Sequence, residues 1–124
     1  MRRNRPEQDI QRAVFEHLAI RGAPGMFAFH PANGGWRSPI EARILKGLGV
    51  KAGVPDIIAV KDGHFHALEL KTVDGRLTPA QIEVHKLLES AGAEVATGYG
   101  LDDALDWLET WGLLLGSRYK ENVA

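Results

Sequence analysis

The sequence predicts an α/β protein in which helices flank a mixed β-sheet. Three observations lead to this class. The chain has 124 residues, 44% of them hydrophobic and 25% charged, which suits one soluble domain with one core. Helical and strand-like patterns alternate along it. A hairpin signal is followed by a helix and a further strand, and this succession requires antiparallel and parallel pairs within one sheet.

The first predicted elements are a helix over about residues 7–20 and a short strand over 26–30. Pro6 suits the start of that helix and Gly22 its end. The apolar residues of the helix recur at every fourth position and so share one face: Ile10, Val14 and Leu18.

A glycine-rich loop over 31–38 leads to a second, shorter helix. The run Ser38-Pro39-Ile40-Glu41 has the form of a capping box with proline at the first helical position. We expect this helix to end near Gly47 or Gly49.

A β-hairpin is the clearest local signal in the middle of the chain. Residues 56–60 begin with an aspartate and continue as an apolar run that is typical of a buried strand. Asp62-Gly63 is a strong signal for a tight turn. The returning strand is predicted from His64 to about Lys71.

Two helices and one strand complete the predicted domain. The segment Thr78-Pro79-Ala80-Gln81 again has capping-box form and begins a helix that Gly92 closes. The apolar positions of this helix keep helical spacing: Val84, Leu87, Leu88 and Ala91. A strand over 94–99 follows, and then a helix capped by Asp102 or Asp103. That last helix carries Leu105, Leu108 and Trp111 or Gly112.

Composition excludes several classes of protein. The chain has no cysteine, which rules out a disulfide scaffold and a thiolate zinc site. It has no run of about 18 apolar residues, so we expect no membrane span. No apolar stretch follows its N-terminus, so we expect no secretory signal. A cytoplasmic protein is the simplest interpretation. The formal net charge of −1 shows no basic excess of the kind that many nucleic-acid-binding proteins have. This does not exclude that class, because carboxylates that bind a metal would offset lysines and arginines that bind phosphate.

The residues that indicate chemistry lie at one end of the predicted hairpin. Glu69 and Lys71 are two positions apart on a strand and therefore project from the same face, whereas Leu70 projects into a core. Asp56 begins the partner strand, and a hairpin of this length brings it opposite the region from Glu69 to Lys71. Two carboxylates and an ammonium group therefore converge.

This set of groups suits phosphodiester hydrolysis. Mg²⁺ prefers hard oxygen ligands, which Asp56 and Glu69 supply, and the backbone carbonyl of Leu70 is a candidate for a third. We expect Mn²⁺ to substitute for Mg²⁺. Lys71 is placed to orient or deprotonate the attacking water, or to counter the charge that develops on the phosphate.

A surface ladder of ion pairs is the alternative interpretation of the same three residues. Two details weigh against it. Glu69 and Lys71 lie in a strand, Phe65–Lys71, that is otherwise apolar. Pro55 lacks an N–H for a sheet ladder and marks a change of chain geometry directly before Asp56.

The ordered pattern resembles a known family. Gly53-x-Pro55-Asp56 followed by Glu69-x-Lys71 is the signature of the PD-(D/E)xK nuclease superfamily. The surrounding sequence resembles its VRR-NUC branch, above all the small stand-alone forms of phages and bacteria. The match runs from about Glu7 to Gly112 and includes the Asn33-Gly34-Gly35 loop and the segment 77–81. It implies a restriction-endonuclease-like fold with an αβααβββαβ-like core.

The resemblance also implies the roles of individual residues. Asp56, Glu69 and Glu7 would be metal ligands, with Lys71 as the catalytic lysine and Gln81 near the reaction centre. Two alternatives stay open. Gln81 also suits the capping box of its own helix, and Glu7 also suits the first turn of its helix as a carboxylate that stabilises the helix dipole.

Candidates for binding the phosphates of DNA lie around the glycine-rich loop. They carry hydrogen-bond donors or a positive charge: Asn33, Arg37, Ser38 and Lys51. A plain surface loop is the alternative interpretation. The arginines of residues 1–6 form a basic arm that suits tracking along DNA, and Trp36 suits either stacking on a base or packing on its own domain.

The histidines give little signal. His64 and His66 share the strand face opposite Glu69, so we expect no zinc site there. His30 adjoins the loop and is a candidate for contacting substrate. No role is predicted for His85.

The predicted function is that of a Mg²⁺-dependent endonuclease acting on DNA, in a nuclease domain over residues 7–115 with a tail over 116–124. The resemblance implies selectivity for branched DNA, as in a Holliday-junction resolvase of repair or recombination, and a homodimer in a bacterial or phage-infected cell. A duplex nickase, or a nuclease of replication or packaging, is the alternative enzyme. A non-catalytic DNA-binding module and a partner-binding subunit are alternatives from other classes. We expect no small-molecule cofactor.

Overall fold

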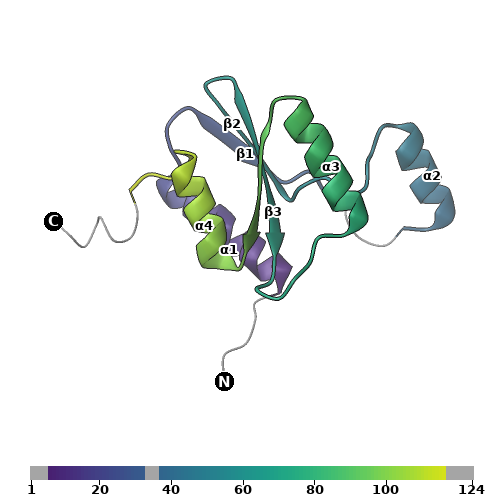
Figure 1. Cartoon of the computed structure of the whole chain (residues 1–124), viewed down its shortest axis with the longest axis horizontal. Coiled ribbons are helices and arrows are strands. Elements are labelled where there is room, and N and C mark those ends of the chain that lie inside the picture. The colour runs from purple at the N-terminus through teal and green to yellow at the C-terminus, as the bar shows by residue number, and fades with distance from the viewer. Residues whose placement is uncertain (1–5, 33–36, 117–124) are drawn as a thin grey trace.

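The computed structural model describes residues 6–32 and 37–116, and within them the chain forms four helices and four strands (Figure 1). In chain order these are α1 (Glu7–Arg21), β1 (Met26–Phe29), α2 (Pro39–Gly47), β2 (Ile57–Lys61), β3 (His64–Lys71), α3 (Pro79–Ser90), β4 (Glu94–Tyr99) and α4 (Leu101–Thr110). This is the order that the residue patterns predict. Most of the predicted basic arm, Asn33, Trp36 and the tail beyond Gly116 lie outside the described residues.

The observed order is shorter than the superfamily core that the resemblance implies. Among the described residues one helix, rather than two, separates the first two strands, because Gly49, Gly53 and Pro55 interrupt the chain after α2. The run of three consecutive strands in the superfamily core is a pair here. The tight turn at Asp62-Gly63 joins β2 directly to β3, and α3 follows β3. The chain then continues beyond β4 into α4.

The four strands form one mixed sheet in the order β1-β2-β3-β4. The pairs β1–β2 and β2–β3 are antiparallel, and β3–β4 is parallel because α3 crosses between them. Asp62 and Gly63 have φ values of 52° and 76°, as a two-residue hairpin turn requires. The predicted α/β class with a mixed sheet is confirmed.

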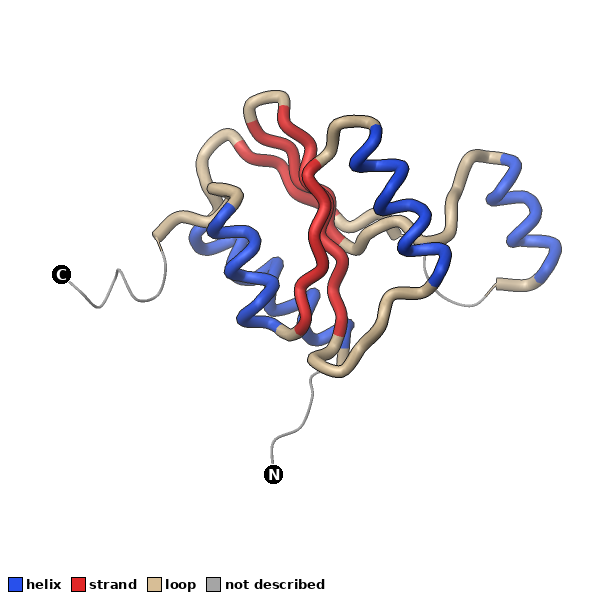
Figure 2. Tube along the Cα trace, viewed as in Figure 1, coloured by secondary structure: helices blue, strands red, loops and turns tan. Residues whose placement is uncertain are grey.

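The hydrophobic core lies between one face of the sheet and the helices α1 and α4 (Figure 2). It contains buried aliphatic residues from all of these elements: Ile10, Val14, Leu18, Ile57, Leu68, Leu70, Leu105 and Leu108. Gly98 of β4 lets α4 approach closely, since a Cβ there would lie 2.7 Å from the Cα of Ala104.

The other face of the sheet is only partly covered. α3 packs beside β4, but Phe27, Phe29 and Phe65 on the β1–β3 side are 68%, 40% and 38% exposed. Of the apolar positions of α3, Leu87 is 59% exposed, and His85 is the one buried residue of this helix. The reason is positional, because α3 leaves the β1 side of the sheet open.

The cap of α4 also differs from expectation. Its N-cap is Gly100 with φ 91°, not Asp102 or Asp103. The Asp103 carboxylate instead accepts a hydrogen bond of 2.8 Å from the backbone N–H of Tyr99, just before the helix. The left-handed conformation of Gly100 therefore starts the helix earlier than a side-chain cap would. None of the described helices has the length and apolar character needed to cross a membrane.

Candidate active site

Asp56 and Glu69 meet across the β2–β3 hairpin. Ile57 pairs with Leu68, so the residue before β2 lies beside Glu69. The Asp56 carboxylate accepts a hydrogen bond of 2.8 Å from the backbone N–H of Leu70. This bond anchors Asp56 to the strand that carries Glu69, as the hairpin length predicts.

Glu69 is a buried carboxyl group that two side chains of α3 contact. It is 2% exposed, and its two oxygens face different residues of α3. Nε2 of Gln81 donates to Oε2 at 3.2 Å, and Nε2 of His85 lies 3.1 Å from Oε1. Burying a charged group is costly unless hydrogen bonds or an opposite charge stabilise it, so this arrangement restrains both the position and the charge of Glu69.

The pKa of Glu69 rises to about 9. Burial is the largest cause, and the adjoining Asp56 adds to it through a hydrogen bond and its negative charge, whereas Lys71 opposes the rise. Two carboxyl groups that meet in a buried place are stable with either a shared proton or a bound cation between them. The pair therefore has the electrostatic character of a cation site.

Lys71 connects the hairpin to the start of α1. It lies two residues after Glu69 on the same face of β3 and is 6% exposed. Its Nζ is 4.0 Å from a carboxylate oxygen of Glu7, the first residue of α1. The structure thus places Glu7 beside Lys71. Glu7 lies at the edge of the site whose centre is the pair Asp56 and Glu69.

Gln81 combines the two interpretations that the sequence left open. Its Oε1 accepts from the backbone N–H of Thr78 at 2.9 Å, which completes the capping box of α3. Its Nε2 donates to Glu69. The amide oxygen of Gln81 therefore caps the helix, and its amide nitrogen binds the carboxyl group of Glu69.

His85 is the site residue that the sequence analysis missed. It lies one turn beyond Gln81 on α3, is 8% exposed and contacts Glu69. Burial lowers its pKa, which favours the neutral imidazole. The available signal was the spacing of four between Gln81 and His85, which puts both on one helical face.

Two further residues set the backbone of the site. The carbonyl of Asp56 accepts a hydrogen bond of 2.7 Å from Nδ1 of His30, which follows β1. Gly53 has φ 86°, and a Cβ at this position would lie 2.5 Å from the carbonyl oxygen of Ala80. The glycine of the Gly53-x-Pro55-Asp56 segment is therefore required by the close approach of this segment to the first turn of α3.

The donor set suits a hard cation that keeps part of its water shell. Within residues 6–32 and 37–116, no three histidine or acidic side chains form a complete metal cage. Mg²⁺ is commonly held by one or two carboxylates together with waters and substrate oxygens. The pair Asp56–Glu69 fits that pattern, whereas zinc prefers a closed set of four nitrogen, sulfur or oxygen ligands.

The predicted phosphate-binding residues that the structure describes, Arg37, Ser38 and Lys51, group around α2. Ser38 caps this helix, with its hydroxyl accepting from the backbone N–H of Glu41 at 3.2 Å. Arg37 and Lys51 line one surface hollow beside the helix. His66, on the face of β3 opposite Glu69, packs against Trp111 with ring centroids 5.1 Å apart.

Comparison with known proteins finds likeness in structure rather than in sequence. No protein-family model matches the sequence, and no curated protein matches it. A solved VRR_NUC domain protein superposes with a TM-score of 0.71 at 23% identity, covering 90% of this chain and 93% of its own. A second VRR_NUC domain gives a TM-score of 0.59 at 17% identity, over 85% of this chain and 96% of its own.

A more distant match is Hjc of Archaeoglobus fulgidus, described as a Holliday junction resolvase. It gives a TM-score of 0.47 at 21% identity and covers 75% of this chain and 67% of its own, which is too loose to support an inference about this chain. Both VRR_NUC superpositions extend over most of this chain. The chain therefore has the fold of the VRR-NUC domain proteins, as the signature in its sequence predicts.

Proposed function

We propose that this chain is a metal-dependent endonuclease that hydrolyses phosphodiester bonds of DNA at the cluster of Asp56, Glu69 and Lys71. The observation that carries the proposal is a buried Glu69 with the Asp56 carboxyl beside it and a buried lysine two residues away on the same face. A purely structural hairpin has no reason to bury a carboxyl group and an ammonium group beside a second carboxyl group.

The cation in this proposal is Mg²⁺, with Mn²⁺ as a substitute. Asp56 and Glu69 would hold it, together with the backbone carbonyl of Leu70. The carboxylate of Glu7 would approach from the edge of the site, beside Lys71. When bound, the ion would polarise the phosphate and lower the pKa of water. The Leu70 N–H is already bound to Asp56, so the ligands on the two strands are fixed relative to each other.

The protein side chains have separate tasks in this proposal. Lys71 orients the attacking water or counters the negative charge that grows on the phosphate oxygens. Gln81 and His85 hold the two oxygens of Glu69, which fixes the orientation of this carboxyl group. Arg37 and Lys51, beside α2, bind the DNA backbone.

The finer substrate proposal is branched DNA, cut as by a junction resolvase in repair or recombination. Its support is the resemblance of the sequence to stand-alone VRR-NUC forms. The near-neutral net charge of −1 is in keeping with an enzyme that recognises a DNA shape at localised patches.

The test is incubation of the full chain with Mg²⁺ and labelled single strands, duplexes, flaps, splayed arms and four-way junctions. Cleavage that requires the metal and stops with a chelator is expected. Lys71→Ala should lower the rate by about 100- to 1000-fold while DNA binding persists. Lys86→Ala, an exposed lysine on α3, is the matched control and should cleave as wild type.

Three outcomes distinguish the alternatives. Paired symmetric nicks in the junction support the resolvase, and preferential nicking of plain duplex supports the nickase instead. If Lys71→Ala and wild type behave alike on every DNA, with binding but no metal-dependent cleavage, the enzyme proposal is wrong and the chain is a binding module.

A further inference from the structure

His30 contacts the main chain of Asp56 just after the end of β1. Its Nδ1 lies 2.7 Å from the carbonyl oxygen of Asp56. Because a carbonyl oxygen only accepts hydrogen bonds, Nδ1 carries the proton and donates it. The contact therefore restrains the main chain of Asp56 and does not occupy its carboxylate.

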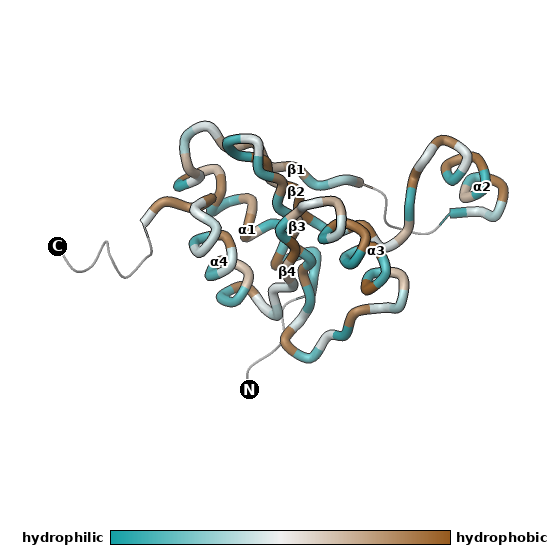
Figure 3. Tube along the Cα trace, turned by 45° about the horizontal axis from the view of Figure 1, so that its top comes forward, coloured by the Kyte–Doolittle hydropathy of each residue, from teal (hydrophilic) through white to brown (hydrophobic). Residues whose placement is uncertain are grey.

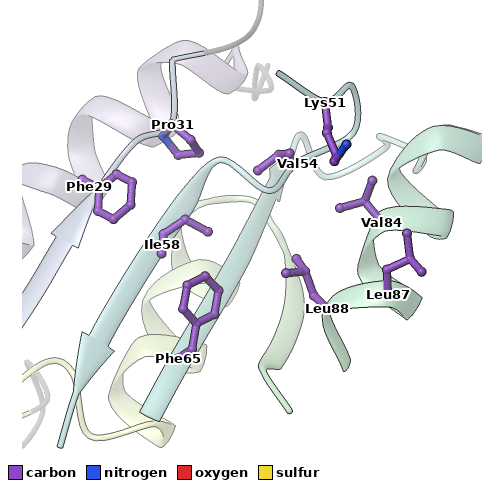
Figure 4. A pocket seen from close by; sticks show the side chains of 9 residues that line it. All are labelled: Phe29, Pro31, Lys51, Val54, Ile58, Phe65, Val84, Leu87 and Leu88. Atoms are coloured by element: carbon purple, nitrogen blue, oxygen red, sulfur yellow. The ribbon is translucent and has the colours of Figure 1, made fainter. Parts of the chain in front are cut away.

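The ring of His30 supplies a donor where the backbone of β1 has none. β1 is the edge strand of the sheet, next to β2 (Figure 3). Its last pair joins Phe29 to Ile58, and Pro31 lies beyond the end of the strand (Figure 4). The same antiparallel register, continued by two residues, puts Pro31 opposite Asp56. Proline has no N–H for a neighbouring strand, and the Asp56 carbonyl accepts from the His30 side chain instead.

Asp56 is thereby held from both of its neighbouring strands. His30, after β1, binds its carbonyl oxygen, and the backbone N–H of Leu70 in β3 donates to its carboxylate at 2.8 Å. The regular pairing of β2 with β3 begins at Ile57, one residue after Asp56. Asp56 therefore lies just outside the ladder, and these two contacts restrain its main chain and its side chain separately.

We propose that His30 is a positioning residue for Asp56, which holds the main chain so that the Asp56 carboxylate meets the cation in the right place. The inference rests on the proposed cation site of Asp56 and Glu69 and adds to it a group from the β1 side of the sheet. Groups that orient a metal ligand typically change metal affinity or activity by about 10- to 100-fold. The His30 side chain is exposed, so its loss removes little packing and the folded chain persists.

The first experiment measures Mn²⁺ binding to the full chain by calorimetric titration, without DNA. His30→Ala should weaken the binding by about 10-fold or more, with a folded chain by circular dichroism. His30→Asn should restore most of the affinity, because its amide nitrogen lies close to the place of Nδ1 and donates to the same carbonyl. His30→Gln should not, since its amide nitrogen matches the other ring nitrogen. His64→Ala is the matched control, an exposed histidine at the start of β3, and should bind as wild type.

The outcomes separate this inference from the proposed function. A wild type that binds no Mn²⁺ contradicts the proposed cation site and the inference together. A wild type that binds Mn²⁺ while His30→Ala binds it equally well leaves the cation site standing and overturns the role of His30. Rescue by His30→Gln rather than His30→Asn also overturns it. If His30→Ala does not fold, the comparison of these two amide variants decides.

The second experiment separates positioning of Asp56 from a direct contact between His30 and DNA. It measures cleavage by wild type and His30→Ala while the concentrations of Mg²⁺ and of the preferred DNA are varied in turn. The Mg²⁺ concentration for half-maximal rate should rise in His30→Ala by about the factor that Mn²⁺ binding loses, and KM for DNA at saturating Mg²⁺ should stay the same. A raised KM with an unchanged Mg²⁺ requirement would mean that His30 binds the DNA itself, and that result overturns the inference.

Discussion

Nε2 of His85 lies 3.1 Å from Oε1 of Glu69. Gln81 holds the other oxygen of the same carboxyl group at 3.2 Å, so two side chains one turn apart on α3 fix the group that we propose as a metal ligand. Groups that hydrogen-bond to a metal ligand orient it, and their loss typically weakens metal affinity or activity by about 10- to 100-fold.

His85→Ala is therefore expected to lower cleavage by about 10- to 100-fold and to raise the Mg²⁺ concentration needed for half-maximal rate. His85→Gln, whose amide nitrogen can replace the ring nitrogen, should recover part of the loss. His64→Ala is the control, because this histidine is exposed and lies on the face of β3 opposite Glu69. Unchanged rate and Mg²⁺ dependence in His85→Ala would show that the contact has no role in the reaction.

Asp56 has a structural and a chemical task that substitutions can separate. Asp56→Asn keeps an oxygen that can accept from the Leu70 N–H, so stability should change little, whereas cleavage should be lost with the negative charge. Asp56→Ala leaves that N–H unpaired, and the free energy of unfolding should fall by about 1–3 kcal/mol. Urea denaturation and cleavage rates of both variants provide the measurements. Equal destabilisation by the two substitutions would contradict the assigned hydrogen bond.

Much of the fold and the centre of the site were predictable because local signals agree with tertiary structure there. The Asp62-Gly63 turn and the apolar strands fix the hairpin, and the hairpin register alone brings Asp56 beside Glu69. Lys71 follows from the two-residue period of a strand. These relations need no knowledge of how the helices pack.

What the sequence did not reveal depends on packing between distant elements. The role of His85 requires α3 to lie over the end of β3, and helical spacing alone does not say which neighbour a face meets. The exposure of Leu87 on α3, and of Ile40, Ile44 and Leu48 on α2, likewise depends on which elements cover these helices, and helical periodicity alone does not say that.

Gly53 illustrates the same point and leads to a stability prediction. Gly53→Ala should lower the free energy of unfolding by about 1–3 kcal/mol more than Gly25→Ala, because the added Cβ collides with the backbone of Ala80. Gly25 is the matched control: its φ of 79° is close to the 86° of Gly53, but a Cβ there meets nothing within 4 Å. Thermal or urea unfolding of both variants measures the difference. Equal losses would mean that backbone conformation alone, and not the approach to α3, requires this glycine.

The pKa of Glu69 predicts how stability depends on pH and metal. The folded chain holds this proton up to about pH 9, whereas the unfolded chain releases it near the ordinary value of 4.5, so the folded state binds more protons between those limits. Without metal, stability should therefore fall as pH rises through this window. Glu69→Gln removes the titrating group and should flatten the fall.

Mg²⁺ competes with that proton for the carboxylates, so its stabilising effect should grow as the pH rises. Urea unfolding at about pH 7.5 and about pH 8.5, with Mg²⁺ or a chelator, measures both effects between the ordinary pKa of 4.5 and the raised pKa of about 9 of Glu69. The difference between the Mg²⁺ and chelator curves should be larger at the higher pH for wild type and nearly absent in Glu69→Gln. Wild type that gains equally from Mg²⁺ at both values, or a variant that gains as much as wild type, would place the cation away from Glu69.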